Sequence, residues 1–193
     1  MTSTMRGPAL VADPDTRWRT RDIVVAAVIG VAFGVAFVLA GGPWKALEFM
    51  GPLQNVVYGI WLLPAIVAPL IVRKPGAALF AEMVAAGLSA ILGSAWGVDT
   101  LLSGFVQGAA AELVFAFTLY RSWNVAVLAI AGLASSAAAF VHDVVVWYQG
   151  YASDVLVVIA ISMAISGLVF VPLASIALVR ALRSTGVLDG FPA

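Results

Sequence analysis

Residues 23–44 read IVVAAVIGVAFGVAFVLAGGPW, a run of 22 residues without a charged side chain. A bilayer hydrocarbon core about 30 Å thick is crossed by roughly 20 apolar residues in a helix, so this run predicts a helix that spans a membrane. Similar runs with few ionisable residues follow at 49–72, 75–98, 100–120, 122–153 and 155–179. The sequence therefore predicts an all-α membrane protein with six transmembrane helices.

The composition excludes a soluble globular domain and several classes of chemistry. Of the 193 residues, 63% are hydrophobic and only 10% are charged, and the mean hydropathy is +1.06. There is no cysteine and only one histidine, which excludes disulfides, thiolate catalysis and a histidine-rich metal site. No P-loop pattern, no H-E-x-x-H pattern and no basic aromatic patch is present. We expect no catalytic residue, no cofactor, no bound metal and no nucleic-acid partner.

The cations predict how the chain lies in the membrane. Nine of the ten Lys and Arg residues precede the first run, follow an even-numbered run or follow the last one: Arg6, Arg17, Arg19, Arg21, Arg73, Lys74, Arg121, Arg180 and Arg183. Only Lys45 falls on the opposite side. Because cytoplasmic loops are enriched in Lys and Arg, we expect residues 1–21 and 184–193 to be cytoplasmic tails around a membrane domain at 22–183 in the cell membrane.

Four ionisable residues lie inside the predicted spans, where such groups are rare and usually functional. Glu82 and Glu112 stand at similar distances from the cytoplasmic ends of neighbouring spans, so we expect that they can meet, whereas His142 and Asp143 lie near the outer side. The acids have no Lys or Arg at matching depth. They either are neutral and join helices through hydrogen bonds, or they meet a cationic or amino-bearing ligand.

The outer half also carries many aromatic and amide side chains: Trp44, Gln54, Asn55, Tyr58, Trp61, Trp96, Trp147, Tyr148 and Tyr151. Gln54, Tyr58 and Trp61 share one helix face by their spacing of four and three residues. Rings beside carboxylates suit a flat, positively charged or aminated heterocycle. The alternative is an aromatic belt at the membrane interface.

A stripe of small residues on the first span predicts a close helix contact. Ala26, Gly30 and Gly34 recur every four residues, which lets another helix approach the backbone. The neighbour is either another helix of this chain or a second subunit. A second stripe of small residues lies at Ala32, Ala36 and Ala40.

Several sequence blocks in a fixed order resemble a known family, the substrate-binding S components of energy-coupling factor (ECF) transporters, of the YkoE type associated with thiamine and hydroxymethylpyrimidine. The blocks are Tyr58–Trp61, Arg73–Leu79 with Glu82, Gly93–Gly97, Val106–Glu112, Gly132–Ser136 with Asp143, Ile165–Gly167 and Thr185–Gly190. His142 departs from the pattern of this type, where an aromatic residue is expected.

The resemblance implies a six-helix S component of an ABC-type importer, which takes up a vitamin from outside. A transmembrane T component and two cytoplasmic ATPase subunits would complete the importer. It implies a T-component contact at Ala26, Gly30 and Gly34, and an outward pocket made by the loop after the first helix and by the fourth to sixth helices. Together with the residue patterns, it gives a candidate substrate-binding set: Tyr58, Trp61, Glu82, Trp96, Gln107, Glu112, His142, Asp143 and Trp147.

Other functions stay open on the sequence alone. The chain could be an S component for another vitamin or for a metal. It could instead be a stand-alone proton-coupled carrier that uses Glu82 and Glu112 as a relay. An intramembrane enzyme is disfavoured, because the sequence shows no pair of nucleophile and base. His142 is the one candidate base, and it has no evident nucleophile beside it.

Overall fold

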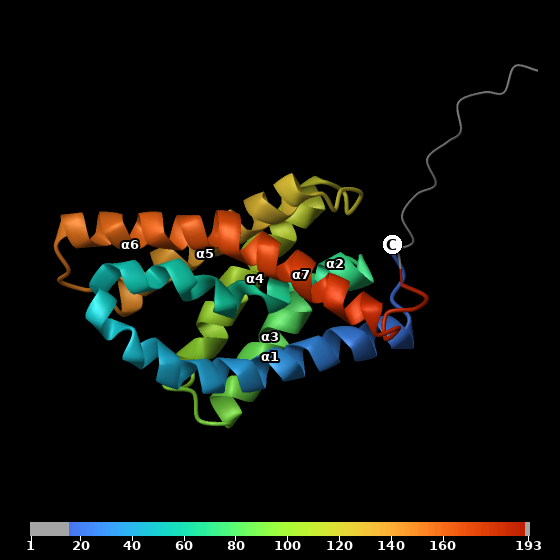
Figure 1. Cartoon of the computed structure of the whole chain (residues 1–193), viewed down its shortest axis with the longest axis horizontal. Coiled ribbons are helices and arrows are strands. Elements are labelled where there is room, and N and C mark those ends of the chain that lie inside the picture. The colour runs from blue at the N-terminus through green and yellow to red at the C-terminus, as the bar shows by residue number, and fades with distance from the viewer. Residues whose placement is uncertain (1–15, 192–193) are drawn as a thin grey trace, which may run out of the picture.

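The computed structural model describes residues 16–191, and this part of the chain consists of helices and short connections (Figure 1). The elements in chain order are α1 (Thr20–Ala46), η1 (Glu48–Leu62), α2 (Pro64–Val72), α3 (Ala77–Ile91), α4 (Asp99–Phe117), α5 (Val125–Val146), α6 (Ser153–Ile165), η2 (Ser166–Phe170) and α7 (Val171–Ser184). Since η1 continues into α2, and α6 continues through η2 into α7, the described residues form six helices, as predicted. The predicted tail at residues 1–15 and residues 192–193 lie outside the described part. The division into tails and membrane domain stays a prediction.

Five of the six helices are long and apolar enough to cross a membrane, and α3 is the shorter one. The span predicted at 75–98 begins at Ala77 and ends at Ile91, because a turn follows in which Gly93 has a positive φ of 89°. Fifteen residues at 1.5 Å each extend about 23 Å. α3 is therefore shorter than the hydrocarbon core that the neighbouring helices can cross.

Two of the prolines lie next to changes of helix type. The segment η1 contains 3-10 turns that are interrupted by a kink at Gly51, and it ends at Leu62, shortly before α2 begins at Pro64. Pro69 lies inside α2. The π-helical turn η2 ends at Phe170, and Pro172 lies in the first turn of α7. Proline has no backbone N–H to donate. The missing N–H of Pro64 and of Pro172 therefore explains why the regular hydrogen-bond pattern is interrupted near these residues.

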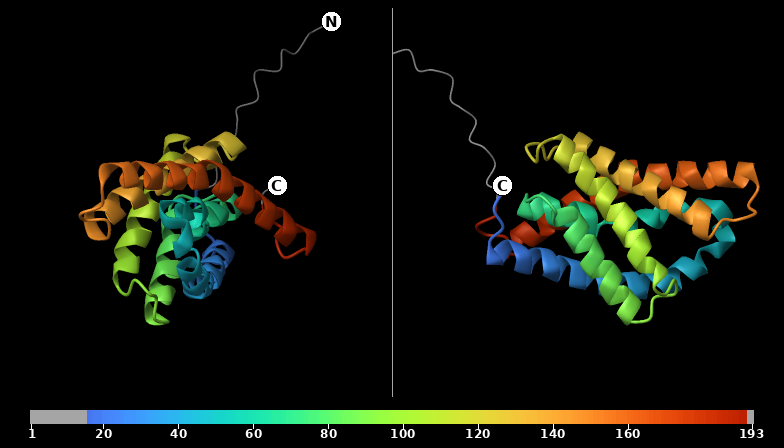
Figure 2. Two further views of the ribbon diagram at one scale, coloured as in Figure 1. Left: turned by 60° about the vertical axis from the view of Figure 1, so that its left-hand side comes forward. Right: turned by 180° about the vertical axis from the view of Figure 1, so that it is seen from behind.

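Small residues allow the helices to pack closely around α3 and around η2. α3 lies between α1 and α4, with Ala78, Ala81 and Ala85 fully buried. On the other side of the bundle, a Cβ placed on Gly167 would lie 2.4 Å from the carbonyl oxygen of Gly132. The backbones of α5 and η2 are thus in direct contact. In the right-hand view of Figure 2, α3 and α4 cross in front of α1, and α5 lies beside the long α6–α7 helix.

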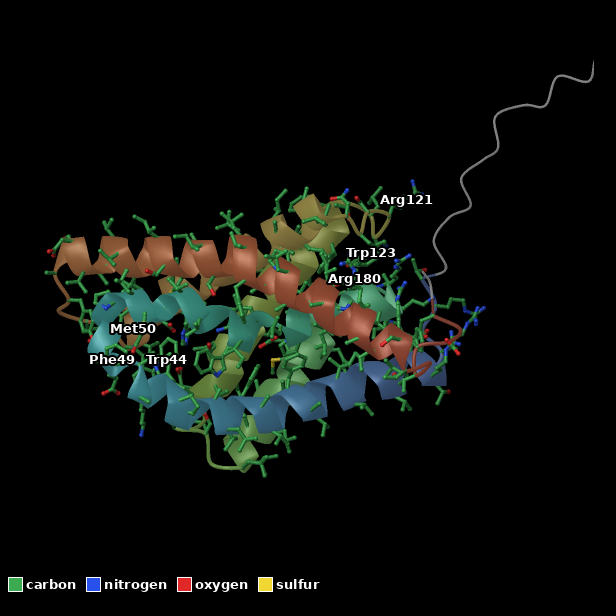
Figure 3. All side chains as sticks on the ribbon, in the orientation of Figure 1. Trp44, Phe49, Met50, Arg121, Trp123 and Arg180 are labelled. Atoms are coloured by element: carbon green, nitrogen blue, oxygen red, sulfur yellow. The ribbon has the colours of Figure 1, made fainter. Side chains whose placement is uncertain are left out.

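The two ends of the bundle differ in chemistry. Arg121, Trp123 and Arg180 lie toward one end, and Trp44, Phe49 and Met50 lie at the other (Figure 3). The first and last described segments meet at the Arg121 end, where the Arg21 guanidinium lies 4.3 Å from the centre of the Phe191 ring. The described chain therefore begins and ends at the cationic end.

Candidate functional site

A cavity of about 390 Å³ opens between the helices at the end of the bundle that carries Trp44. Its lining comes from α1, η1, α3, α4 and α5, and from the connections that follow α3 and α5. Seven residues of the predicted substrate-binding set line it: Tyr58, Trp61, Glu82, Trp96, Gln107, Asp143 and Trp147. Seven of the nine predicted residues therefore lie around one cavity, although α6 and α7 supply none of the lining residues.

One wall of the cavity is a continuous cluster of aromatic rings. Trp61 lies at its centre, with ring centroids 4.7 Å from Trp44, 5.4 Å from Trp96 and 5.6 Å from Tyr58. Edge-to-face pairs at these distances are favourable and hold the rings in place. The four residues come from α1, η1 and the α3–α4 connection, and together they form a surface that an aromatic or cationic ligand can contact.

Three polar atoms at the cavity have no hydrogen-bond partner among the described residues. They are Oε1 of Glu82, Nε1 of Trp61 and Oε1 of Gln54. The other oxygen of Glu82, Oε2, accepts a hydrogen bond of 3.1 Å from the backbone N–H of Ala65. Buried polar atoms normally have a partner, and Glu82 is only 1% exposed. Three residues that line the cavity therefore each carry a buried polar atom without a hydrogen-bond partner in the described part of the chain: a carboxylate oxygen, an N–H donor and an amide oxygen.

Gln107 is oriented by its neighbours toward the same cavity. Its Nε2 donates to Oγ of Ser103 at 2.6 Å and to the hydroxyl of Tyr58 at 3.2 Å. Its backbone carbonyl accepts from Oγ of Ser135 at 2.9 Å. The amide is thereby fixed between α4 and η1, and it links two walls of the cavity.

The carboxylates give the cavity an acidic lining. Glu48, Glu82, Asp99 and Asp143 line it, and within residues 16–191 no Lys or Arg does so. At the mouth, in the connection after α5, burial and the nearby Asp143 carboxylate raise the pKa of the Tyr148 hydroxyl above its usual range. Tyr148 is therefore neutral at physiological pH. An acidic, partly desolvated cavity of this kind attracts cations.

His142 lies behind the cavity wall rather than in it. Its Nδ1 is 2.9 Å from Oδ1 of Asp143, and its Nε2 is 3.2 Å from Oδ1 of Asp99. The second oxygen of Asp99 accepts a hydrogen bond of 2.8 Å from Nε1 of Trp147. The imidazole thus joins α4 to α5 through two carboxylates that both face the cavity.

Glu112 does not line the cavity and does not meet Glu82. Its carboxylate accepts backbone hydrogen bonds at the start of α3, 2.6 Å from Gly76 N and 2.9 Å from Ala78 N, and one of 2.7 Å from the Tyr120 hydroxyl. In the α4–α5 connection, burial and the bond to Glu112 raise the pKa of Tyr120, which keeps this donor protonated. A carboxylate at a helix N-terminus stabilises the helix dipole, so these contacts give Glu112 a structural role.

The stripe of small residues on α1 faces the interior of the chain. Ala26 is fully buried, and a Cβ on Gly30 would lie 2.7 Å from Cβ of Val84. A Cβ on Gly34 would lie 2.9 Å from the carbonyl oxygen of Ala85. Of the two neighbours considered for this stripe, α3 of the same chain is the one present.

Several lining residues were missed by the sequence patterns. Asp99 falls between the predicted runs at 75–98 and 100–120 and was not included among the candidate site residues, yet it is in the first turn of α4 and lines the cavity. Glu48 was placed between two predicted spans, and Ser103 has no distinctive pattern. An acid in the first turn of a helix is common, because it interacts favourably with the helix dipole. For Asp99, only its position near Asp143 in space indicates a further role.

The described residues do not provide a metal site. Within residues 16–191, no group of three or more His, Asp or Glu side chains is placed to hold one ion. His142, Asp99 and Asp143 do not converge, because the carboxylates contact opposite nitrogens of one ring.

Comparison with known proteins agrees with this architecture. Residues 21–138 match the family described as the permease component of an ABC-type cobalt transport system. A solved structure, the crystal structure of an S-component of an ECF transporter, superposes with a TM-score of 0.85 at 36% identity and covers 90% of both chains. The chain belongs to the ECF-transporter S components. It is therefore a multi-pass membrane protein and a non-catalytic, substrate-binding subunit of a transporter, and the resemblance noted in its sequence is confirmed.

A curated relative of this S component comes from Bacillus subtilis (strain 168). It is YkoE, named a candidate HMP/thiamine permease protein, and it is 36% identical over 176 residues, which are 90% of this chain and 88% of the relative. The similarity thus extends over almost all of the described helices.

Proposed function

We propose that this S component captures thiamine or its hydroxymethylpyrimidine precursor from outside the cell. Delivery would use a transmembrane T component and two cytoplasmic ATPase subunits. The observation that carries the proposal is the combination of an aromatic wall with unpaired polar atoms and four carboxylates in one cavity. The name of the Bacillus subtilis relative supports the same ligands.

The cavity chemistry matches the chemical groups of these ligands. Thiamine joins a cationic thiazolium ring to an aminopyrimidine ring, and hydroxymethylpyrimidine carries the aminopyrimidine ring alone. An amino group can donate to the unpaired Oε1 of Glu82, while a ring nitrogen can accept from Nε1 of Trp61. A thiazolium cation suits the aromatic wall and the acids Asp99 and Asp143. The volume of about 390 Å³ is in the range of small-molecule sites.

The direction of capture follows from the positions of the cations. Arg21, Arg73 and Arg121 belong to the end of the bundle opposite the cavity, and Lys and Arg are enriched on the cytoplasmic side. The proposal therefore places the cavity mouth outside and both termini inside the cell.

The T component would have to contact a surface other than the buried stripe of α1. Ala32 is exposed, and Ala36 and Ala40 are partly buried, so the second stripe of small residues is the part of α1 that another subunit can reach. We place the T-component contact there in the proposed complex.

Binding measurements on the purified chain test the substrate assignment. Isothermal titration calorimetry with thiamine and with hydroxymethylpyrimidine should give saturable binding for at least one of them. Riboflavin and biotin serve as controls of comparable size. Absence of binding by both pyrimidines, or equal binding of the controls, would reject the assignment.

Delivery is tested separately in cells. Uptake should require a T component and the ATPases, so it should stop when those genes are deleted. Uptake that continues would favour a stand-alone carrier.

A further inference from the structure

The His142 imidazole sits between two carboxylates that both line the cavity. Its ring nitrogens lie 2.9 Å from Asp143 and 3.2 Å from Asp99, and the side chain is 5% exposed. A neutral imidazole has one N–H and one bare nitrogen lone pair. Between two ionised carboxylates, one contact would then bring a lone pair against a negatively charged oxygen.

One additional proton removes that repulsion. If both ring nitrogens carry a proton, each donates to its own carboxylate, and both contacts become charge-assisted hydrogen bonds. On the ring, this proton makes both hydrogen bonds charge-assisted, whereas on Asp143 it would leave only the contact with Asp99 charge-assisted. The remaining oxygen of Asp99 is already an acceptor for Trp147, and it is satisfied in this arrangement.

The other groups that face these three residues do not supply a competing positive charge. Tyr58 from η1 and Tyr148 from the α5–α6 connection both interact with Asp143. Glu48 and Glu82 line the same cavity. Of the described groups at this site, only His142 can become cationic.

We propose that His142 is a positioning residue that holds an exchangeable proton between Asp99 and Asp143, and that binding of a cationic ligand releases this proton. This inference rests on the proposed function, because it takes thiamine as the cation. Before binding, the imidazolium and two carboxylates have a net charge of −1. When the thiazolium reaches the carboxylates, its positive charge neutralises one of the two negative charges. The imidazolium then loses its additional proton to solvent and becomes a neutral ring. The total charge is the same before and after.

The direct test uses the fact that the chain has one histidine. Nitrogen-15 labelling of histidine gives one imidazole spin system, whose shifts distinguish an imidazolium from a neutral ring. We expect the imidazolium pattern in the ligand-free protein near pH 7.5 and the neutral pattern with saturating thiamine. A neutral ring in the free protein would overturn the proposal, and this part of the test is independent of whether thiamine binds.

Calorimetry supplies the second readout. Thiamine titrations in buffers of different ionisation enthalpy should show about one proton released per ligand, so that affinity rises up to about tenfold per pH unit wherever the ring is protonated before binding. Hydroxymethylpyrimidine, measured where it is neutral, should release none. Release of no proton with thiamine, in a protein that binds it, would overturn the proposal. Failure of both ligands to bind would instead reject the proposed function.

Asp99→Asn separates this role from simple structural support. Its amide group can donate to Nε2 of a neutral His142 while its oxygen accepts from Trp147, so every contact is kept without the additional proton. We expect weaker thiamine binding with no proton release.

Asp154→Asn is the matched control, because Asp154 is an exposed acid in the first turn of α6 outside the cavity lining. This variant should release the proton as the original chain does. Unchanged release in Asp99→Asn would contradict the proposal; if that variant does not fold, the histidine spectrum of the original chain decides.

Discussion

Glu82 lines the cavity; one of its carboxylate oxygens accepts a hydrogen bond from the backbone N–H of Ala65, and the other has no partner among the described residues. Glu82→Gln can keep the first contact and present an amide N–H to the cavity instead of an acceptor. Loss of an acceptor for a buried amino group costs about 1–3 kcal/mol, so thiamine affinity should fall about 5- to 150-fold. Calorimetry on the folded variant measures it. Unchanged affinity would exclude Glu82 from the binding contacts.

Glu112→Gln is the matched control for Glu82→Gln, because Glu112 does not line the cavity. In Glu112→Gln, a neutral side chain replaces the carboxylate that accepts from Gly76, Ala78 and Tyr120. We expect a loss of about 1–3 kcal/mol of stability, seen as a lower melting temperature, with thiamine affinity unchanged. A normal melting temperature with lost binding would return Glu112 to the substrate site.

At the residue scale, the sequence located the kinds of side chain but not always the face on which they lie. Tyr58, Trp61 and Asp143 were predicted from periodicity and from the cost of burying charge, and they line the cavity. Glu112, like Glu82, is an acid inside an apolar run. The depth of a residue along its helix does not tell which neighbouring residue its side chain contacts, so the sequence did not separate the two roles. Asp99 was missed because its partner His142 is 43 positions away, beyond any local pattern.

The backbones of α5 and η2 approach each other closely at Gly132 and Gly167. A Cβ on Gly167 would lie 2.4 Å from both the Gly132 carbonyl oxygen and Oγ of Ser136. Gly167→Ala should therefore destabilise the protein by about 1–3 kcal/mol or more, measured by thermal unfolding in detergent. Gly42→Ala is the control, because nothing lies within 4 Å of a Cβ there. Equal melting temperatures for the two variants would contradict this packing.

The two faces of α1 should respond differently to a larger side chain. Gly30→Leu would place a leucine against Val84 and the backbone of α3, so it should lower the yield of folded protein. Ala32→Leu alters an exposed position. It should leave folding and thiamine binding intact but reduce co-purification with the T component. Normal co-purification of Ala32→Leu would place the T-component contact elsewhere.

At the element scale, the apolar runs predicted the number and order of helices well, because the bilayer sets a length that composition reveals. The exact helix type was not predictable. The long 3-10 segment η1 and the π-turn η2 depend on contacts between distant residues, such as the 2.8 Å hydrogen bond from Gly59 N to Oγ of Ser166. The stripe of small residues on α1 predicted a close helix contact, but it did not predict that α3 would be the neighbouring helix.

For the whole molecule, the orientation in the membrane is testable because the chain has no cysteine. Ser153→Cys introduces a thiol beside the cavity end, and Ser184→Cys introduces one at the end of α7; both positions are exposed. We expect a membrane-impermeant maleimide to label Ser153→Cys in intact cells and Ser184→Cys only after permeabilisation. The reverse pattern would place the cavity mouth toward the cytoplasm.

The short α3 has a consequence for the surrounding lipid. A helix about 23 Å long lies between two that match a full hydrocarbon core, and its end at Ile91 and Leu92 is exposed. Hydrophobic mismatch of this kind is relieved by local thinning of the bilayer or by a tilt of the protein. Acyl chain length therefore becomes a physical control on this subunit: reconstitution in thin bilayers should favour tilts in which α3 spans the membrane, whereas thick bilayers should oppose them.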